Sequence, residues 1–309
     1  MIRRILPVVL LIIMVFISTA FARESTYIEP EETWDPPSPG PLNAWSAPLL
    51  EAGTMVVQPL FYYNRARGIF NETGSYKSFV DGEKFYQNIW DLVLYYGVTD
   101  KLEIDFEGFY YQNYAQAGPD INWDEGRIGD SYIYARYCLM EEKDKHWMPC
   151  VTAMAQMKFP TGSYQKFDPD KLGTDMSGTG SYDQGYGVVL TKRIKPFILH
   201  ADFVYNIPVH VMVDGIKTNY ADYINLDFAV EYILPKGFSL LLEANYLQQG
   251  DMKLDGDLAP ASDTGFLQLV PGIGWSCKHI RTLFCYQRTI AGTNTDVYDS
   301  FACTAILAF

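Results

Sequence analysis

Beyond residue 22 the sequence lacks any apolar run close to the roughly 18 residues that suggest a membrane-spanning helix. It contains only four histidines, and its five cysteines are widely spaced without a CxxC pair. Basic residues number 24 against 37 acidic residues, so the basic surface that binds nucleic acid is absent. We therefore expect no helical membrane spans, no nucleic-acid partner, no metal site and no cofactor.

The first 22 residues have the pattern of a secretory signal peptide. Arg3 and Arg4 precede an apolar stretch over Ile5–Ile17, and Ala20-Phe21-Ala22 fits the small-x-small pattern of a cleavage site. A membrane anchor is the alternative, but the stretch is shorter than the roughly 20 residues that cross a bilayer. Residues 1–22 are thus predicted to direct export, and Arg23 is predicted to begin the mature chain.

Residues 23–53 are acidic and rich in proline, which makes a folded domain of their own improbable. The prolines are Pro30, Pro36, Pro37, Pro39, Pro41 and Pro48. The composition predicts an extended periplasmic lead-in. A short plug that enters a following barrel is the alternative interpretation.

Residues 54–309 alternate between segments of period-2 hydrophobicity and turns. Twelve segments are expected, starting near Thr54, Phe85, Leu102, Ser131, Pro149, Tyr186, Phe197, Ala221, Phe238, Phe266, Arg281 and Phe301. Their lengths of about 9 to 14 residues suit tilted strands that cross a bilayer. Short connectors alternate with long polar ones, as in outer-membrane barrels. We predict an all-β fold: a transmembrane antiparallel up-and-down β-barrel of about 12 strands, with both termini periplasmic.

The two faces of these segments differ in polarity. Ile104 and Phe106 share one face of a segment, whereas Glu103, Asp105 and Glu107 share the other. A soluble sandwich with one wet side has the same alternation. Aromatic residues near strand ends favour the membrane barrel, because interfacial girdles occupy such positions. They are Tyr96, Tyr110, Tyr205, Tyr232 and Tyr246, all on the apolar face.

The chain ends on phenylalanine. Phe301, Cys303, Ala305, Leu307 and Phe309 alternate along one face of the last segment. A final strand that closes on a C-terminal aromatic residue resembles the signal read by the barrel-assembly machinery, so we expect Phe309 to be an assembly signal.

Four motifs resemble a family of outer-membrane transporters named after the MetA pathway of phenol degradation. They are Tyr96–Ile104 (YGVTDKLEI), Gly129–Tyr132 (GDSY), Lys158–Gly162 (KFPTG) and Gly178–Asp183 (GTGSYD). Each motif alone is a common turn pattern, so their order and spacing support the resemblance. The resemblance implies a pore for hydrophobic or aromatic small molecules in the outer membrane of a Gram-negative cell.

If the apolar faces contact lipid, the polar faces line a lumen. The predicted lumen-lining residues are Asp91, Glu103, Asp105, Glu107, Arg136, Lys158, Arg193, His200, Asp202, Asp227, Glu231 and Glu243. Most acids and most bases belong to different strands, so an acidic arc is expected to face a basic arc. Such charges either set a transverse field in a water-filled constriction or pair with one another and fill a narrow barrel.

Cys138 and Cys150 fall on the inward face of two successive segments joined by a turn near Asp144. A hairpin centred on this turn places them directly opposite one another, and the oxidising environment after export permits a disulfide. We therefore predict a cross-strand disulfide. The odd number of cysteines leaves at least one thiol unpaired within the chain.

The sequence thus favours a channel through which small molecules diffuse, with outer-membrane lipid, the assembly machinery and a small solute as partners. An adhesin or receptor that uses the long loops, and a plugged structural barrel, are the alternatives. An outer-membrane lipid hydrolase is less favoured, because His146 and His279 fall in expected periplasmic turns and His210 begins a loop. The inward His200 has no serine at useful spacing. We expect no enzymatic activity. The patterns do not predict an oligomeric state.

Overall fold

The computed structural model describes residues 34–308 apart from 81, 119–120, 143–147 and 278–279. The predicted signal peptide and the predicted assembly signal Phe309 lie outside the described residues. No helix in the described part of the chain is long and apolar enough to cross a membrane.

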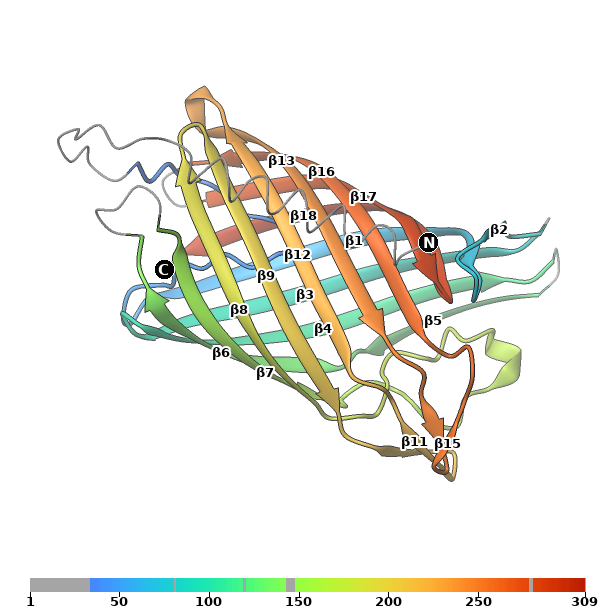
Figure 1. Cartoon of the computed structure of the whole chain (residues 1–309). Coiled ribbons are helices and arrows are strands. Elements are labelled where there is room, and N and C mark those ends of the chain that lie inside the picture. Colours follow the sequence, from blue (N-terminus) through green and yellow to red (C-terminus); the bar gives the residue numbers. More distant parts are fainter. Residues whose placement is uncertain (1–33, 81, 119–120, 143–147, 278–279, 309) are drawn as a thin grey trace.

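The described residues form a closed antiparallel β-barrel (Figure 1). A 14-stranded sheet contains β2 and β5 as flanking strands, and the other twelve strands form the wall. The wall strands are β1 (Met55–Phe70), β3 (Lys84–Thr99), β4 (Leu102–Gln116), β6 (Ser131–Met140), β7 (Cys150–Phe159), β8 (Asp183–Ile194), β9 (Phe197–Pro208), β12 (Tyr223–Ile233), β13 (Phe238–Gln249), β16 (Thr264–Ser276), β17 (Ile280–Thr293) and β18 (Thr295–Ala308). The predicted twelve-stranded barrel is confirmed.

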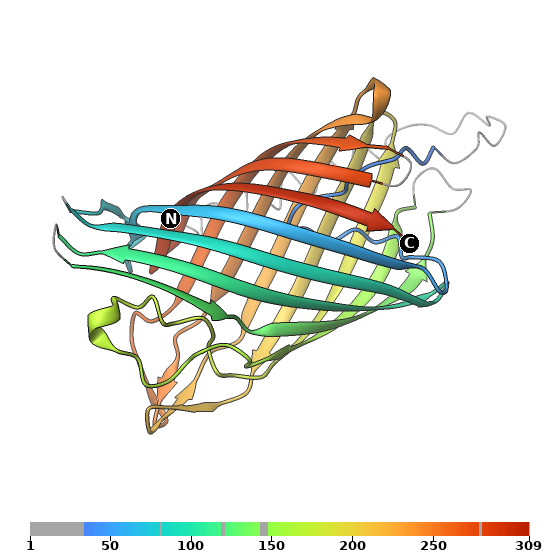
Figure 2. The ribbon, with the colours of Figure 1, turned by 180° about the vertical axis from the view of Figure 1, so that it is seen from behind.

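The barrel closes where its last strand pairs with its first. Figure 2 shows β1 in blue beside β18 in red, and their register runs from Val56 opposite Ala308 to Phe70 opposite Thr295. Because Val56 and Ala308 are neighbours, the wall begins and ends at the same end of the barrel. This is also the end at which the strands are joined by short turns, and we call it the short-turn end.

At the opposite, long-loop end several strands extend further than expected. The last segment, expected to start near Phe301, begins at Thr295 as β18, separated by one residue from the end of β17 at Thr293, so that expected start is wrong. Ser300 is buried opposite Asn64 of β1, whereas Asp299, on the other face of β18, bonds to Arg67 at 2.5 Å. Two short strands, β2 (Tyr76–Ser78) and β5 (Asn122–Ile128), pair with β1 and β4 at this end.

A second, small sheet lies outside the wall at the long-loop end (Figure 1). It contains β10 (Val211–Val213), β11 (Ile216–Asn219), β14 (Lys253–Leu254) and β15 (Asp257–Leu258), which come from two loops. Two short 3-10 helices complete the described elements: η1 (Pro169–Lys171) within the longest loop and η2 (Pro235–Gly237) in a short turn.

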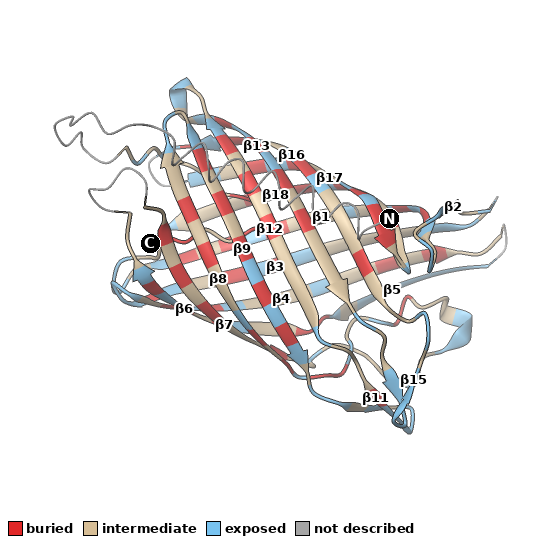
Figure 3. Cartoon of the chain, viewed as in Figure 1, coloured by how far each residue is buried: buried red, intermediate tan, exposed pale blue. Residues whose placement is uncertain are grey.

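Burial alternates along the wall strands, as Figure 3 shows. The predicted aromatic girdle residues point outward: Tyr96, Tyr110, Tyr205 and Tyr232 are 39 to 47% exposed. Outward rings also contact one another across strands, as in Phe61–Trp90–Tyr110 with centroids 5.4 and 5.7 Å apart. An apolar and aromatic outer face is what a lipid-facing wall requires.

The outward face generates a first prediction. Leu242 lies near the middle of β13 and is 56% exposed. Leu242→Arg is expected to lower the free energy of unfolding by about 2–4 kcal/mol, because a charged side chain would enter hydrocarbon. The measurement is urea unfolding of the barrel inserted in lipid vesicles.

Met212→Arg is the matched control, since Met212 is 50% exposed but lies in the small outer sheet. It should change stability by no more than about 0.5 kcal/mol. Equal effects of the two arginines would contradict a lipid-facing β13.

Candidate functional site

The predicted lumen-lining residues do point to the interior of the barrel. The buried members are Asp91, Glu103, Asp105, Arg136, Lys158, His200, Asp202, Asp227, Glu231 and Glu243, whereas Glu107 and Arg193 are partly buried. Arg193 lies near the short-turn end and bonds to Glu142 and Asp35.

Arg136 on β6 is the centre of the first cluster. Its guanidinium bonds to Glu103 and, at 2.7 Å, to Asp105, both on the neighbouring β4. Adjacent strands therefore pair these charges. The expected arrangement, with an acidic arc facing a basic arc across the lumen, is not found here. A buried guanidinium paired with two carboxylates fills space instead of leaving a free cation in the lumen.

His200 on β9 belongs to a second cluster. Its Nε2 lies 3.0 Å from Glu231, and its Nδ1 lies 3.1 Å from the hydroxyl of Thr191. Ser38 also donates to Glu231. Both nitrogens of the buried ring thus have structural partners. This arrangement does not resemble a catalytic base beside a nucleophile, because Glu231 and Thr191 hold the imidazole within the wall.

The segment predicted as a lead-in contacts the interior side chains of the wall. We call residues 38–50 the luminal segment. Three consecutive N–H groups, of Leu42, Asn43 and Ala44, donate to the Glu243 carboxylate at 2.9, 3.0 and 2.9 Å. A buried carboxylate that accepts several N–H donors is strongly stabilised. One wall acid thus holds a whole turn of the segment.

Further along the luminal segment, other N–H groups bind other strands. Trp45 donates to Asp202 at 2.8 Å, and Leu50 donates to Glu103 at 2.6 Å. Ala47 donates to Thr191 and accepts from Thr152, at 2.8 and 2.6 Å. The segment is therefore attached to β4, β7, β8, β9 and β13 at once, and it crosses the lumen.

Apolar contacts accompany these hydrogen bonds. Leu42 and Ala44 share one buried cluster with inward residues of seven wall strands, namely Leu60, Val93, Ala229, Leu241, Val270, Leu283, Cys285 and Ala302. Ala47 belongs to a second cluster that contains Met154 and Val189. The interior near the luminal segment is therefore a packed core as well as a polar network, which the alternation of faces alone did not indicate.

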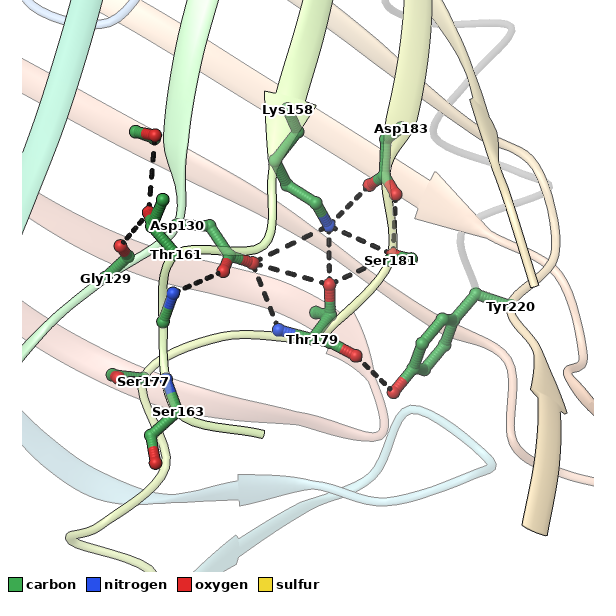
Figure 4. A network of polar contacts seen from close by, with 12 residues as sticks. Gly129, Asp130, Lys158, Thr161, Ser163, Ser177, Thr179, Ser181, Asp183 and Tyr220 are labelled. Carbon is green, nitrogen blue, oxygen red and sulfur yellow. Dashed lines mark hydrogen bonds and ion pairs between the residues drawn. The ribbon is translucent and has the colours of Figure 1, made fainter. Parts of the chain in front are cut away.

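Lys158 anchors the longest loop at the other end of the barrel (Figure 4). Its ammonium lies 2.6 Å from Asp183 and 3.8 Å from Asp130, and it donates to Thr179 and Ser181. Asp130 in turn accepts the backbone N–H groups of Gly162 and Thr179 at 3.0 Å each. Asp130, Asp183, Thr179 and Ser181 were not among the predicted site residues. They belong to the GDSY and GTGSYD motifs, which the structure brings together with KFPTG.

The anchored loop folds toward the lumen. Thr174 and Asp175 are buried, and Asn113, an inward residue of β4, donates to the backbone carbonyls of Thr174 and Met176 at 3.0 and 3.3 Å. The mouth at the long-loop end is thus narrowed by residues 160–182.

In the described part of the chain no group of three or more His, Cys, Asp or Glu residues could hold a metal ion.

The predicted disulfide is not present. Cys138 lies opposite Thr152, two positions from Cys150, because the pairing of β6 with β7 is offset from that of a hairpin centred on Asp144. Cys150 is an end residue of β7. All five cysteines are free thiols. The expectation that Cys138 and Cys150 lie directly opposite one another is therefore wrong, since it depended on the exact centre assumed for the turn.

The Lys158 cluster generates a second prediction. Lys158→Met removes the cation and leaves Asp130 and Asp183 buried without it. Loss of one partner of a buried ion pair costs about 3–5 kcal/mol. We expect a lower unfolding temperature and faster protease cleavage within residues 160–182 of the folded protein.

Lys171→Met is its control, because Lys171 pairs with Glu125 at 2.8 Å on a more accessible part of the same loop. It should cost no more than about 1 kcal/mol. If both variants keep the cleavage rate of the unaltered protein, Lys158 does not anchor the loop.

A family model described as "Putative MetA-pathway of phenol degradation" matches residues 116–300, more than half of the chain. No curated protein sequence is significantly similar.

Two solved outer-membrane structures are similar to this chain. An outer membrane channel from Pseudomonas putida F1 superposes with a TM-score of 0.70 at 14% identity, over 87% of this chain and 100% of that one. The NanC porin gives a TM-score of 0.49 at 12% identity, over 81% of this chain and 98% of that one. Of these two superpositions only the first, with its TM-score of 0.70, supports a shared barrel architecture.

Proposed function

The chain belongs to the family described as "Putative MetA-pathway of phenol degradation", and we propose that it is an outer-membrane channel for the diffusion of small hydrophobic or aromatic molecules. Family membership and the barrel architecture support a membrane channel, and the narrow interior favours small solutes. The proposed arrangement has the short-turn end and both termini in the periplasm, after export by the predicted signal peptide and insertion by the assembly machinery.

One observation determines how the proposed channel works: a single chain segment occupies the lumen and is attached by hydrogen bonds and apolar contacts. The carboxylates of Glu243, Asp202 and Glu103 accept its backbone N–H groups. Such bonds can exchange for bonds to water when the segment moves. The channel is therefore proposed to be narrow at rest and to widen when the luminal segment is displaced.

The interior beyond the luminal segment is accessible. Glu107, Phe109 and Tyr111 alternate with outward residues on β4 and are nevertheless only partly buried. An inward side chain of a closed barrel meets solvent from the lumen. This accessible part, between the luminal segment and the long-loop end, supports a path for solutes.

A receptor or adhesin role is the second candidate, and one feature favours it. The small outer sheet exposes four large apolar side chains, Met212, Ile216, Leu254 and Leu258, each 38 to 55% exposed. Apolar residues gathered on a loop sheet can bind another macromolecule. This role predicts binding without conductance.

The third prediction tests the channel in planar lipid bilayers. A variant that lacks residues 38–50 should have a larger unit conductance than the full chain, because the segment no longer fills the lumen. Glu243→Gln should also raise the conductance. The carboxylate of Glu243 presents two acceptor oxygens to three N–H donors, whereas the amide would present only one. Glu51→Gln, at an exposed position, should leave it unchanged.

Correct folding of each variant is checked by its heat-dependent migration in gel electrophoresis. If folded full chain and folded deletion variant both lack conductance, and neither releases small solutes from liposomes, the channel proposal is wrong.

A further inference from the structure

Five aromatic rings form a continuous column along one side of the interior. We define the aromatic column as Tyr111 and Phe109 of β4, Tyr132 and Tyr134 of β6, and Trp45 of the luminal segment. Phe109 stacks on Tyr111 at 6.0 Å and 12°, and it meets Tyr132 edge-on at 6.1 Å and 80°. Tyr132 stacks on Tyr134 at 5.9 Å and 9°, and Tyr134 contacts Trp45 at 4.7 Å. These separations are those of favourable ring pairs.

Three rings of the column, those farthest along it from Trp45, face accessible space. Phe109, Tyr111 and Tyr132 point inward, as Glu103 and Arg136 of the same strands do, yet they are only partly buried. Outward neighbours such as Tyr110 are separated from them by the wall. The faces of these three rings therefore border the lumen. Trp45 ends the column where the luminal segment begins to fill the interior.

Two carboxyl groups lie beside the column. Asp91 of β3 is directly opposite Phe109 in the register of β3 and β4, and Glu107 precedes Phe109 by two residues on the same face. Tyr134 donates to Glu107. Asp91 is 4% exposed, and its Oδ1 has no hydrogen-bond partner among the described residues. A buried acceptor without a donor is unfavourable unless a ligand or water supplies one.

The two bases beside the column already have partners: Lys158, opposite Tyr132 in the register of β6 and β7, lies 2.6 Å from Asp183. Arg136 contacts the Trp45 ring at 4.9 Å, but its nitrogens bond to Glu103, Asp105 and the carbonyl of Ser46. It has two carboxylate partners, so an added anion would meet an excess of negative charge. The surroundings of the column thus offer acceptors, not a free cation.

From this combination we propose that the aromatic column, with Asp91 and Glu107, is a binding site for planar aromatic molecules whose ring carries an O–H or N–H donor. The ring of the ligand stacks on Phe109 and Tyr132, and its donor bonds to the Asp91 carboxylate after a rotation of that side chain. The inference rests on the proposed channel function, for which it defines the solute class, and it excludes aromatic carboxylates as preferred ligands.

Equilibrium binding of radiolabelled phenol to the purified full chain in detergent tests the site, with protein-free micelles subtracted. Phe109→Leu and Tyr132→Leu should each weaken binding about two- to tenfold, as expected for loss of one ring contact. Asp91→Asn should weaken phenol binding but leave toluene binding unchanged. Aniline should compete with phenol, whereas cyclohexanol and benzoate should not.

Tyr110→Leu is the matched control, because Tyr110 is the outward neighbour of Phe109 and is 45% exposed. It should bind phenol like the unaltered protein. The inference is overturned if folded Phe109→Leu and Tyr132→Leu bind phenol as well as Tyr110→Leu does, or if benzoate competes as strongly as aniline.

Conductance of the same preparations separates this inference from the channel proposal. A protein that conducts but does not bind phenol would refute the site alone. A protein that binds phenol with the stated variant pattern but never conducts would refute the channel and leave the site standing.

Discussion

Closure of the sheet through the pairing of β18 with β1 is the constraint on which the interior depends. Once the sheet is closed, every second side chain must enter a lumen of limited width. Eight of the predicted lumen-lining residues are acids, and only two of the predicted bases, Arg136 and Lys158, are buried among them. Arg136 and Lys158 each take two carboxylates. The remaining acids need hydrogen-bond donors from elsewhere, because buried carboxylates without partners are costly.

The luminal segment supplies donors to three of these acids, Glu231, Asp202 and Glu243, and its sequence explains how. Proline has no N–H group, and the stretch between Pro41 and Pro48 is free of proline. Five of its six N–H groups donate to wall side chains, those of residues 42, 43, 44, 45 and 47. The flanking prolines favour an extended backbone that does not form a helix. A stretch whose composition suggests a linker thus contributes much of the interior.

The strands of the wall could be predicted from the sequence more readily than the contacts in the interior, for a physical reason. Alternation is local, so residues such as Ile104 and Asp105 reveal their faces without knowledge of their neighbours. The luminal segment and the Lys158 cluster depend on distant partners: Leu42 and Glu243 are 201 positions apart. No local pattern specifies such a contact. The Cys138 pairing failed because a polar turn does not reveal the exact centre of its hairpin, and a one-residue change of that centre displaces opposite residues by two positions.

Three of the motifs that were interpreted as turns, GDSY, KFPTG and GTGSYD, also contribute residues to the Lys158 cluster, which their spacing along the chain could not reveal. Asp130 and Asp183 lie 53 positions apart along the chain, yet both contact Lys158. Three of the four motifs therefore meet in one cluster at the long-loop end, where they fix the path of residues 160–182. The fourth, Tyr96–Ile104, makes the turn between β3 and β4 at the short-turn end.

The attachments of the luminal segment are arranged in series along the chain. Ser38 binds Glu231, residues 42–44 bind Glu243, Trp45 binds Asp202, and Leu50 binds Glu103 next to the start of β1. A tension applied to the end that precedes Ser38 would load these attachments one after another and not together. The segment would then peel from the wall in small steps under a modest force, and it would stay tethered to β1 for rapid re-docking.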